Sequence, residues 1–499
     1  MQIRPDQIDP DAARVVARIR QAKHEAYLVG GCVRDLLLGR KPKDFDVATS
    51  AKPNELRRLF RNCRIIGRRF RLAHIFFGRK IIETSTFRAN PRAIEDDQGG
   101  NGNGNGSGKD DLLIRHDNEF GNAVEDARRR DFTINGLFYD IDTGQVIDHV
   151  NGLADLEARL VRTIGDPDIR FREDPVRILR AVKFAARCDL TIESETYRRM
   201  MEHKGEIAKC AQARVSEEFF RLLRAGGARR SFELLLGTGL LEVLSPDLAR
   251  ALQQEPVDEQ GRVRLARFWG YLAAVDRSTI SREETPSDAL LLATLLLPPL
   301  RDALHPDTAA FPDPGQLILQ SAQSIVEQVK ASRRDAEMAR QILLASRYLF
   351  PSSNPDRKRP RLENRDFYQD ALRLVEIVTD AESSNPDLVG RPLPAPEGGA
   401  VAVADEALPP DLQAPVERPG RRRGRRDRRP AQPSAPNRPG EHPIPAPSRE
   451  APAPVLVSDL RSPVFTPIPS LAGLVRPVSL RPAFLGTGPF GSRWGAHAD

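Results

Sequence analysis

"LVGGCVRDLLLGRKPKDFDVATS", residues 28–50, carries two glycines, a leucine-rich run and an Asp-Phe-Asp triplet in close succession. The apolar run Ala26–Val29 before the glycine pair predicts a strand that enters a tight turn. Val33–Leu38 predicts a short helix, which ends where Gly39 follows. Phe45–Ala48 predicts a second strand. A strand, a turn, a helix and a strand in so short a stretch indicate a mixed α/β domain at the start of the chain.

Two carboxylates, Asp44 and Asp46, stand at the entrance of the second predicted strand. Because side chains alternate between the faces of a strand, both would point the same way, while Phe45 points to the other face and can be buried. Two like charges on one face repel each other, and a divalent cation relieves that repulsion. Mg²⁺ commonly takes one or two carboxylates together with substrate phosphates, and two such ions clamp the oxygens of an in-line displacement. For an isolated Asp-x-Asp the alternative interpretation is a solvated turn.

The glycine pair and the arginine after it suit a phosphate group. Gly30 and Gly31 let the backbone come close to a phosphate, and their N–H groups can cradle it. Arg34, on the following predicted helix, can add a charged contact to a triphosphate. Taken alone, such glycines more often form only an ordinary tight turn.

The mixed pattern continues to about residue 150. Ala12–Lys23 predicts a helix, and Ile75–Phe77 and Ile81–Thr86 predict strands. Residues 91–111, with the run DQGGNGNGNGSGKDD, predict a flexible solvated loop, because such a composition cannot form a packed core.

From about residue 150 the pattern becomes helical, and it stays so to about Ala381. Residues 173–190 and 215–227 carry apolar side chains at three- and four-residue spacing. Ser216 is the predicted N-cap of the second of these helices, and the glycine pair at 226–227 its predicted end.

After Asn385 the composition changes. Residues 386–499 hold 23 of the 41 prolines, and they bury too little apolar surface to offset the entropy of ordering, so we expect a disordered tail. Eight arginines against one aspartate within residues 418–429 account for the whole formal net charge of +7. The basic balance of the chain therefore lies in this tail.

The cysteines and the apolar runs indicate the compartment. The four cysteines are far apart, with no Cys-x-x-Cys, which indicates neither a disulfide framework nor a zinc site. The longest apolar run, Ala289–Leu300, is about half of the ~20 residues that a membrane span needs, and we expect Pro298 and Pro299 to break it. The first residues carry no apolar signal-peptide core. We expect a soluble cytoplasmic protein without membrane insertion.

Residues 28–49 resemble the long signature of class II nucleotidyltransferases, which are the bacterial poly(A) polymerases and tRNA CCA-adding enzymes within the DNA polymerase beta superfamily. The resemblance extends over roughly residues 25–245. It implies a nucleotidyltransferase head domain with a mixed sheet, in which Asp44 and Asp46 hold two catalytic Mg²⁺ ions. A dinucleotide-binding oxidoreductase does not fit, because GGCVRD lacks the G-x-G-x-x-G spacing.

A second motif, RRDFTIN, also resembles this family. Arg130 suits a phosphate, Asp131 can accept from a ribose hydroxyl or stand near the metals, and Asn135 can hydrogen-bond sugar or backbone. We therefore place Asp131 with the catalytic aspartates, and Arg130 and Asn135 with the nucleotide-binding residues. Glu83, on the predicted strand after the Asp-x-Asp strand, is either a third acidic group near the metals or a partner of Arg88.

The segment REDPVRILRAVKFAAR resembles the nucleotide-selecting motif of the family. Asp174 is the predicted N-cap of this helix, and Arg177 is expected beside it, one turn on. Together they can read the edge of a base, since a mismatched base leaves buried polar groups unpaired at about 1–3 kcal/mol each. The resemblance implies that Asp174, Arg177, Arg180 and Lys183 contact the incoming nucleotide.

The head motifs do not separate the two activities, but three features favour poly(A) polymerase. Residues 61–89 and 116–135 resemble that subgroup, and bacterial poly(A) polymerases often end in an Arg- and Pro-rich tail. Such a tail can attract the phosphates of varied RNA 3′ ends without regard to sequence. The predicted RNA contacts are Arg421, Arg422, Arg423, Arg425 and Arg426. A solubilising or protein-docking tail is the alternative.

The sequence thus predicts an α+β protein with four parts. Residues 1–150 form a nucleotidyltransferase catalytic head with a mixed sheet, 151–225 a helical neck for base selection and RNA binding, 226–385 a helical RNA-binding body, and 386–499 a disordered Pro/Arg-rich tail. We expect all-helical neck and body domains.

The resemblance implies a polynucleotide adenylyltransferase, an ATP-binding and RNA-binding transferase that adds AMP from ATP to RNA 3′-hydroxyls without a template and releases pyrophosphate. This activity serves polyadenylation in mRNA processing and decay. Its expected partners are RNA 3′ ends of mRNAs and small RNAs, with tRNA left open, and RNA-decay or RNA-chaperone proteins. The alternatives are a tRNA CCA-adding nucleotidyltransferase and, in another class, a non-catalytic RNA-binding protein.

Overall fold

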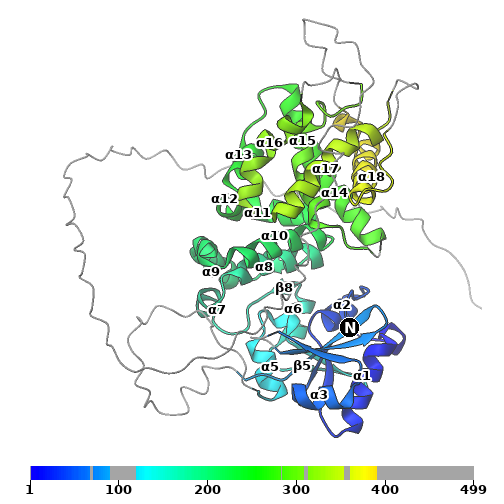
Figure 1. Cartoon of the computed structure of the whole chain (residues 1–499). Coiled ribbons are helices and arrows are strands. Elements are labelled where there is room, and N and C mark those ends of the chain that lie inside the picture. The colour runs from blue at the N-terminus through cyan, green and yellow to red at the C-terminus, as the bar shows by residue number, and fades with distance from the viewer. Residues whose placement is uncertain are drawn as a thin grey trace, which may run out of the picture. The chain divides into compact units, whose positions relative to one another are not determined.

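A computed structural model describes residues 2–67, 71–89, 120–282, 284–307, 313–352 and 360–389 of the 499-residue chain (Figure 1). The predicted loop at 91–111 and the five arginines at 421–426 lie outside these residues. The four cysteines are free thiols.

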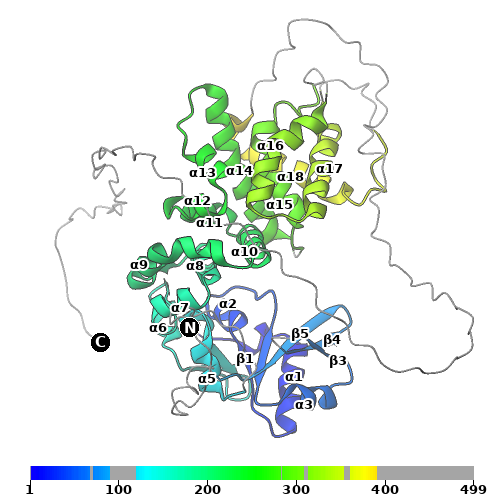
Figure 2. The same cartoon turned by 60° about the vertical axis from the view of Figure 1, so that its left-hand side comes forward.

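The head is built on a seven-stranded sheet in the order β3-β4-β5-β2-β1-β6-β7. The strands are β1 (Ala26–Val29), β2 (Asp46–Thr49), β3 (Cys63–Ile66), β4 (Leu72–Phe77), β5 (Lys80–Thr86), β6 (Leu137–Asp140) and β7 (Gln145–Asp148). Strands β2 and β5 run parallel, and the other neighbours run antiparallel. The predicted mixed sheet is confirmed, and Figure 2 shows β3, β4 and β5 side by side at one end of it.

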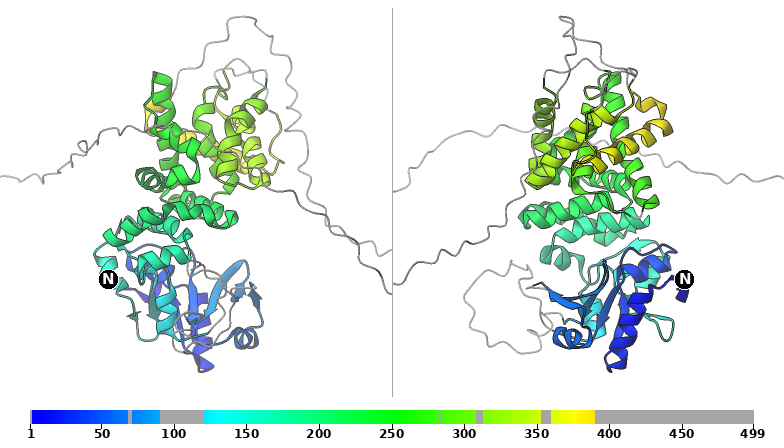
Figure 3. Two further views of the ribbon diagram at one scale, coloured as in Figure 1. Left: turned by 90° about the vertical axis from the view of Figure 1, so that its left-hand side faces the viewer. Right: turned by 45° about the vertical axis from the view of Figure 1, so that its right-hand side comes forward.

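One face of the sheet carries the main core of the head. The helices α1 (Pro10–Gln21), α2 (Gly31–Leu37) and α3 (Pro53–Leu59) pack there, and Figure 3 shows the dark-blue α1 along the strands. Helix α1 begins after Asp9, whose carboxylate accepts from the N–H groups of Asp11 and Ala12. It buries Val15 and Ile19, which are four residues apart and so lie on one side of the helix.

A smaller cluster of apolar side chains packs on the opposite face of the sheet. Ala127 of α5 (Ala123–Arg129) packs there with Val29, Ala48, Phe87 and Phe138, over β1, β2 and β6. Towards β3 this face carries polar and half-exposed side chains instead.

The remaining elements are mostly helices. They are η1 (Pro5–Gln7), η2 (Thr133–Asn135), α6 (Gly152–Glu157), α7 (Pro167–Glu173), α8 (Val176–Cys188), α9 (Ser194–His203), η3 (Lys204–Lys209), α10 (Gln212–Arg224), α11 (Ala228–Gly237), α12 (Leu240–Leu244), α13 (Pro246–Gln253), α14 (Glu259–Ser281), α15 (Asp288–Leu300), α16 (Pro314–Gln328), α17 (Arg333–Leu349), α18 (Tyr368–Ser384) and η4 (Pro386–Leu388). The prediction of an all-helical neck is wrong in one detail, because β8 (Leu160–Val161) and β9 (Thr191–Ile192) form a short parallel pair there.

Helix α10 starts earlier than the sequence predicted. It begins at Gln212, so Ser216 lies inside the helix and is not its N-cap. The Oγ of Ser216 instead donates to the carbonyl of Lys330, 3.1 Å away. The predicted end is confirmed, because Gly226 follows the helix with a φ of +76°.

The body extends beyond the predicted boundary at residue 385. The short helix η4 follows α18, and its Leu388 is only 1% exposed. The carbonyl of Leu388 accepts from Nε of Arg267, which is buried in α14, at 2.7 Å. Residues 386–389 therefore belong to the folded body and not to the tail.

The most apolar helix is α15. The sequence predicted that Pro298 and Pro299 break this run, but the helix continues through both to Leu300. Within the part of the chain that the structure describes, no helix has the length and apolar character that a membrane crossing needs.

Candidate active site

An acidic group lies at the entrance of strands β2 and β5. Asp46 is the first residue of β2, and Asp44 stands exposed two residues before it. In the parallel pairing of β2 with β5, Asp46 lies opposite Glu83. Since residues paired across neighbouring strands point to the same face of a sheet, the carboxylates of Asp46 and Glu83 share a face. Glu83 Oε1 lies 3.5 Å from Nε2 of His74.

The charges of two neighbouring carboxylates act on Asp46. Burial and the charges of Glu83 and Asp44 raise the pKa of Asp46 to about 6, against the lowering effect of Arg130. A set of clustered acidic groups is relieved by a divalent cation, and hard oxygen ligands suit Mg²⁺. Their ligand atoms do not all lie within 4.8 Å of one another, so the side chains would turn inwards to share an ion. The donor set fits the magnesium site predicted for Asp44 and Asp46, with Glu83 beside it.

Gly30 has a backbone conformation that favours glycine. Its φ is +72°, and a Cβ there would lie 2.8 Å from Nη1 of Arg130. Its N–H donates to the carbonyl of Leu137 at 3.0 Å, so this amide is not the free phosphate donor that the sequence suggested. Gly30 instead lets Arg130 approach the turn. Arg130 is held by the carboxylate of Asp126 at 3.0 Å and the carbonyl of Asn135 at 3.3 Å.

Arg34 is buried inside the head, with only 1% of the residue exposed. Its Nη2 donates to Oδ1 of Asp35 at 2.6 Å, its Nη1 donates to Oδ1 of Asn135 at 2.6 Å, and its guanidinium lies 5.0 Å from the ring centre of Phe184. Because these donors are engaged within the protein, the geometry does not support the predicted triphosphate contact. Arg34 lies in α2, which begins at Gly31, and instead holds this helix to Asn135 and Phe184.

Asp131 links the head to the neck. Its Oδ1 accepts from the N–H of Phe132 at 2.9 Å and from Nδ2 of Asn135 at 3.1 Å. Its Oδ2 accepts from Nε of Arg180 in α8 at 2.7 Å. Burial acts to raise the pKa of Asp131, but the charge of Arg180 and these hydrogen bonds hold it well below its usual range. We interpret Asp131 as a positioning residue, in place of the catalytic role that the sequence suggested.

Asp174 lies at the turn between α7 and α8. The prediction that it caps α8 is wrong, because α8 begins at Val176 and has no side-chain cap. Its Oδ2 accepts from Nη2 of Arg214 in α10 at 2.8 Å. Its Oδ1 is buried and has no hydrogen-bond partner among the described residues. Such an oxygen is costly to bury, and the exocyclic amine of a nucleobase could satisfy it.

Arg177 does not pair with Asp174 through its side chain, as the spacing suggested. Its Nη1 donates to Oε2 of Glu173 at 3.0 Å and to the carbonyl of Arg170 at 2.8 Å. Glu173 was not predicted from the sequence as this partner. Its position four residues before Arg177 could have indicated the pair, since such residues are neighbours on a helix.

Arg180 and Lys183 share a second glutamate that the sequence reasoning missed. Nζ of Lys183 donates to Oε2 of Glu218 at 2.8 Å, and Nη1 of Arg180 lies 3.8 Å from its Oε1. Burial and the charge of Arg180 lower the pKa of Lys183 to about 8, against the raising effect of Glu218. Glu218 lies in the apolar run of α10, and a glutamate on a buried helix face was the available signal. Lys183 is therefore a structural partner of α10, whereas Arg180 binds Asp131 at 2.7 Å and approaches Glu218 less closely.

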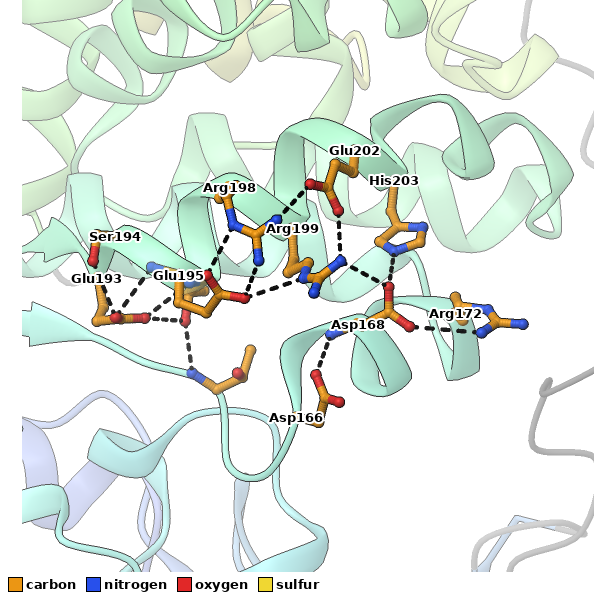
Figure 4. A network of polar contacts seen from close by, with 12 residues as sticks. Asp166, Asp168, Arg172, Glu193, Ser194, Glu195, Arg198, Arg199, Glu202 and His203 are labelled. Atoms are coloured by element: carbon orange, nitrogen blue, oxygen red, sulfur yellow. Dashed lines mark hydrogen bonds and ion pairs between the residues drawn. The ribbon is translucent and has the colours of Figure 1, made fainter.

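Another acidic group, outside this site, is already neutralised by arginines. Ligand atoms of Asp168, Glu202 and His203 lie within 4.8 Å of one another. Figure 4 shows Arg199 between two of them, with Nη1 lying 2.9 Å from Glu202 and 3.5 Å from Asp168. Arg172 lies 3.6 Å from the other oxygen of Asp168. The network joins α7 to α9, and its charges are balanced without a cation.

Two family models match the chain. Residues 26–162 match the model of the poly A polymerase head domain. These residues thus resemble a poly A polymerase head domain. Residues 189–252 match the model described as the probable RNA and SrmB-binding site of polymerase A. The head domain contains the β2–β5 carboxylates, whereas Asp174 and Lys183 lie between the two matched segments.

Several curated proteins resemble this chain over part of its length. Poly(A) polymerase I of Salmonella typhi is 42% identical over 293 residues, which are 59% of this chain and 61% of the relative. Poly(A) polymerase I of Escherichia coli O157:H7 is 46% identical over 243 residues, which are 49% of this chain and 51% of the relative. The CCA-adding enzyme of Lactobacillus gasseri is 37% identical over 231 residues, which are 46% of this chain and 54% of the relative. The chain thus spans about half to six tenths of the length of these relatives.

A solved structure that is similar to this chain is the Bacillus stearothermophilus CCA-adding enzyme in complex with CTP. It is 24% identical with a TM-score of 0.49, over 76% of this chain and 80% of that chain.

Proposed function

We propose that this chain is a polynucleotide adenylyltransferase, which transfers AMP from ATP to RNA 3′-hydroxyls without a template and releases pyrophosphate. The observation that carries the proposal is the pairing of Asp46 with Glu83 across β2 and β5, with Asp44 two residues away, inside a poly A polymerase head domain. The identities of 42–46% to curated poly(A) polymerases I, against 35–37% to CCA-adding enzymes, support the choice of nucleotide.

Asp44, Asp46 and Glu83 would hold two Mg²⁺ ions. Ions bound there would lower the pKa of the RNA 3′-hydroxyl and offset the charge that develops on the leaving pyrophosphate. The chain itself supplies the placement, because the backbone pairing of β2 with β5 fixes two carboxylates on adjacent strands. Burial and the neighbouring carboxylates raise the pKa of Asp46, and a bound cation would offset the repulsion among these groups.

The nucleotide would lie on the side of β2 that is away from β5, beside β1 and the neck. Arg130 is 22% exposed and its charge reaches Asp46, so we place it on the triphosphate. The unpartnered Oδ1 of Asp174 would accept from the exocyclic amine of adenine, with Arg177 nearby in α8. Arg180 and Lys183 would act as positioning residues, through Asp131 and Glu218, which they bind.

The RNA would also contact residues 189–252, which match a probable RNA-binding model. We infer that mRNAs and small RNAs are the substrates, and that the tail arginines, which lie outside the described residues, attract their phosphates. RNA-decay or RNA-chaperone proteins are the partners that we expect. A cytoplasmic location agrees with these substrates and with the free thiols.

The test of this proposal is AMP addition to a single-stranded RNA by the purified full chain with ATP and Mg²⁺. We expect Asp44→Ala to abolish addition while RNA binding stays nearly intact. Asp142→Ala is the matched control, since Asp142 is 68% exposed in the β6–β7 turn, far in sequence from the acidic group. Unchanged turnover in Asp44→Ala would overturn the assignment, and RNA binding without any pyrophosphate release by the unaltered chain would favour a non-catalytic RNA-binding protein.

The second candidate function is CCA addition, which the similarity to CCA-adding enzymes keeps open. A tRNA that ends before CCA, offered with CTP or ATP, distinguishes the two. Incorporation of C, C and A into this tRNA alone would replace poly(A) synthesis by CCA addition and leave the roles of the head residues unchanged.

A further inference from the structure

A row of four side chains crosses the sheet away from the proposed nucleotide site. Asp46 in β2 lies opposite Glu83 in β5, Glu83 lies opposite His74 in β4, and His74 lies opposite Arg64 in β3. Residues paired in this way point to one face of the sheet. The row therefore runs from the acidic group to a cation on the edge strand.

The alternate residues of the same strands show which face this is. Ala73 and Ile75 of β4 and Ile82 of β5 are buried in the main core with α1 and α3. Cys63 and Ile65 of β3 pack against that core as well. The row lies on the opposite face, where the cover from α5 is over β1, β2 and β6.

Aromatic and apolar side chains on this face remain partly exposed. The guanidinium of Arg64 lies 5.5 Å from the ring centre of Phe76, and the rings of His74 and Phe76 lie 6.4 Å apart. Ile66 is 45% exposed and Ile81 is 38% exposed. Among the described residues, no carboxylate lies within ion-pair distance of Arg64. We call Arg64, His74, Phe76 and Glu83 the β3–β5 face.

This chemistry suits a single-stranded nucleic acid. Arginine neutralises a phosphate, and exposed aromatic rings stack on bases of any sequence. A protein partner would need a carboxylate for Arg64, but the same carboxylate would meet repulsion from the adjoining acidic group at Asp46 and Glu83. The 3′ end of an RNA would avoid that conflict, because the Mg²⁺ ions that Asp44, Asp46 and Glu83 would hold could take its oxygens as ligands.

The geometry of the reaction selects the same face. In an in-line displacement, the attacking hydroxyl and the leaving pyrophosphate lie on opposite sides of the phosphorus. The proposed triphosphate contact, Arg130, lies on the β1 side of β2, beside Gly30, which follows β1. The attacking RNA 3′-hydroxyl must then arrive from the other neighbour of β2, which is β5.

We propose that the β3–β5 face binds the last nucleotides of the RNA that is extended, with Arg64 on a backbone phosphate and Phe76 stacked on a base. This inference rests on the proposed function. From β2 to β3 there are three strand spacings, or about 14 Å, which is the length of about four stacked nucleotides. A phosphate contact and a stacked base carry no sequence information, so this surface accepts varied 3′ ends.

The test is a kinetic comparison of Arg64→Ala and Phe76→Ala with the unaltered full chain. Each should raise the RNA concentration for half-maximal AMP addition about fivefold or more, while the KM for ATP and the rate at saturating RNA change less than about twofold. Arg64→Ala should also lower the salt dependence of RNA binding by about 0.7 in the log–log slope. Arg64→Lys should restore part of the affinity, because it keeps the charge.

Arg58→Ala is the matched control, since Arg58 is exposed on α3, which packs on the opposite face. It should leave the RNA dependence unchanged. Photocrosslinking of an RNA with 4-thiouridine within four nucleotides of its 3′ end should label residues 63–86. This arm does not depend on the folding of any variant.

Two results would overturn the proposal. One is an unchanged RNA dependence in both Arg64→Ala and Phe76→Ala while the unaltered chain extends RNA. The other is crosslinking that reaches residues 189–252 and leaves 63–86 unlabelled. If the unaltered chain extends no RNA with any nucleotide, the proposed function itself fails, and that outcome is distinct from both.

Discussion

Arg180→Met tests how firmly the Asp131–Arg180 pair holds α8 to the head. Without Arg180, the Asp131 carboxylate, which is 9% exposed, keeps only the N–H of Phe132 and the amide of Asn135 as donors. Breaking a fully buried pair from one side costs about 3–5 kcal/mol. Arg180 is 33% exposed and two neutral donors remain, so we expect a smaller loss of about 2–3 kcal/mol, or roughly 30- to 150-fold in the opening equilibrium.

Hydrogen exchange of the amides in Val176–Cys188 measures this loss locally, without assuming that the whole chain unfolds in one step. The loss should depend on pH in a defined direction. Arg180 holds the pKa of Asp131 below its usual range, and without Arg180 burial raises it. The variant therefore binds a proton at a higher pH than the unaltered protein. The difference in protection should be full at pH 7 and should shrink as the pH is lowered towards about 4.

The control is Arg198→Met, which removes exposed ion pairs to Glu195 and Glu202 on α9. Exposed pairs contribute little, so the protection of α8 should not change in this variant. Unchanged protection of α8 in Arg180→Met, or an effect that is the same at pH 7 and at low pH, would show that the Asp131–Arg180 pair does not hold α8 to the head.

Three further predictions concern a glycine, a lysine and the C-terminal boundary. Gly30→Ala should raise the KM for ATP severalfold, because the new Cβ would displace Arg130. Gly39→Ala is the control, since Gly39 has a similar φ of +69° but open space around it, and its KM should not change. Equal KM values for the two variants would contradict this prediction. The pKa of Lys183 is lowered to about 8 in the folded protein, against about 10.4 in the unfolded chain. The unaltered protein should therefore gain stability relative to Lys183→Met as the pH rises from about 8 to about 10. Melting temperatures that change in parallel with pH in the two proteins would contradict this. A chain that ends at residue 384 should have a lower melting temperature than one that ends at residue 389, because it lacks the buried Leu388. Truncation of a buried leucine costs about 2–5 kcal/mol. Equal melting temperatures would support the boundary at residue 385.

The strands around the acidic pair were predictable because their signals are local. The predicted strand Ala26–Val29 coincides with β1, and the predicted strand Phe45–Ala48 differs from β2 by one residue at each end. The partner of Asp46 was not predictable in the same way. The parallel pairing of β2 with β5 joins residues on either side of the β3–β4 hairpin, so Glu83 could only be offered as an alternative.

The pairings in the neck depend on backbone geometry that spacing does not reveal. Asp174 precedes a proline, which disfavours helical backbone at that position, and its φ of −153° and ψ of 87° separate α7 from α8. The break turns its carboxylate towards Arg214, while Arg177 reaches back to Glu173. A continuous helix would have given different neighbours.

The end of the body shows how one side chain can override composition. Residues after Asn385 are rich in proline, which predicts disorder. Yet Leu388 packs against Gly270 of α14, where a Cβ would come within 2.6 Å of its Cδ1. Glycine at that position makes the docking of η4 possible, and no pattern within the segment itself could indicate this.

The most direct test of the central claim is nucleotide incorporation by the purified full chain with Mg²⁺, with each of the four NTPs offered separately to a generic RNA and to a tRNA ending before CCA. We expect long A-only extension of the generic RNA and its loss in Asp46→Asn. No incorporation of any nucleotide into either RNA, or undiminished extension by Asp46→Asn, would contradict the claim that the β2–β5 carboxylates form the centre of an adenylyltransferase.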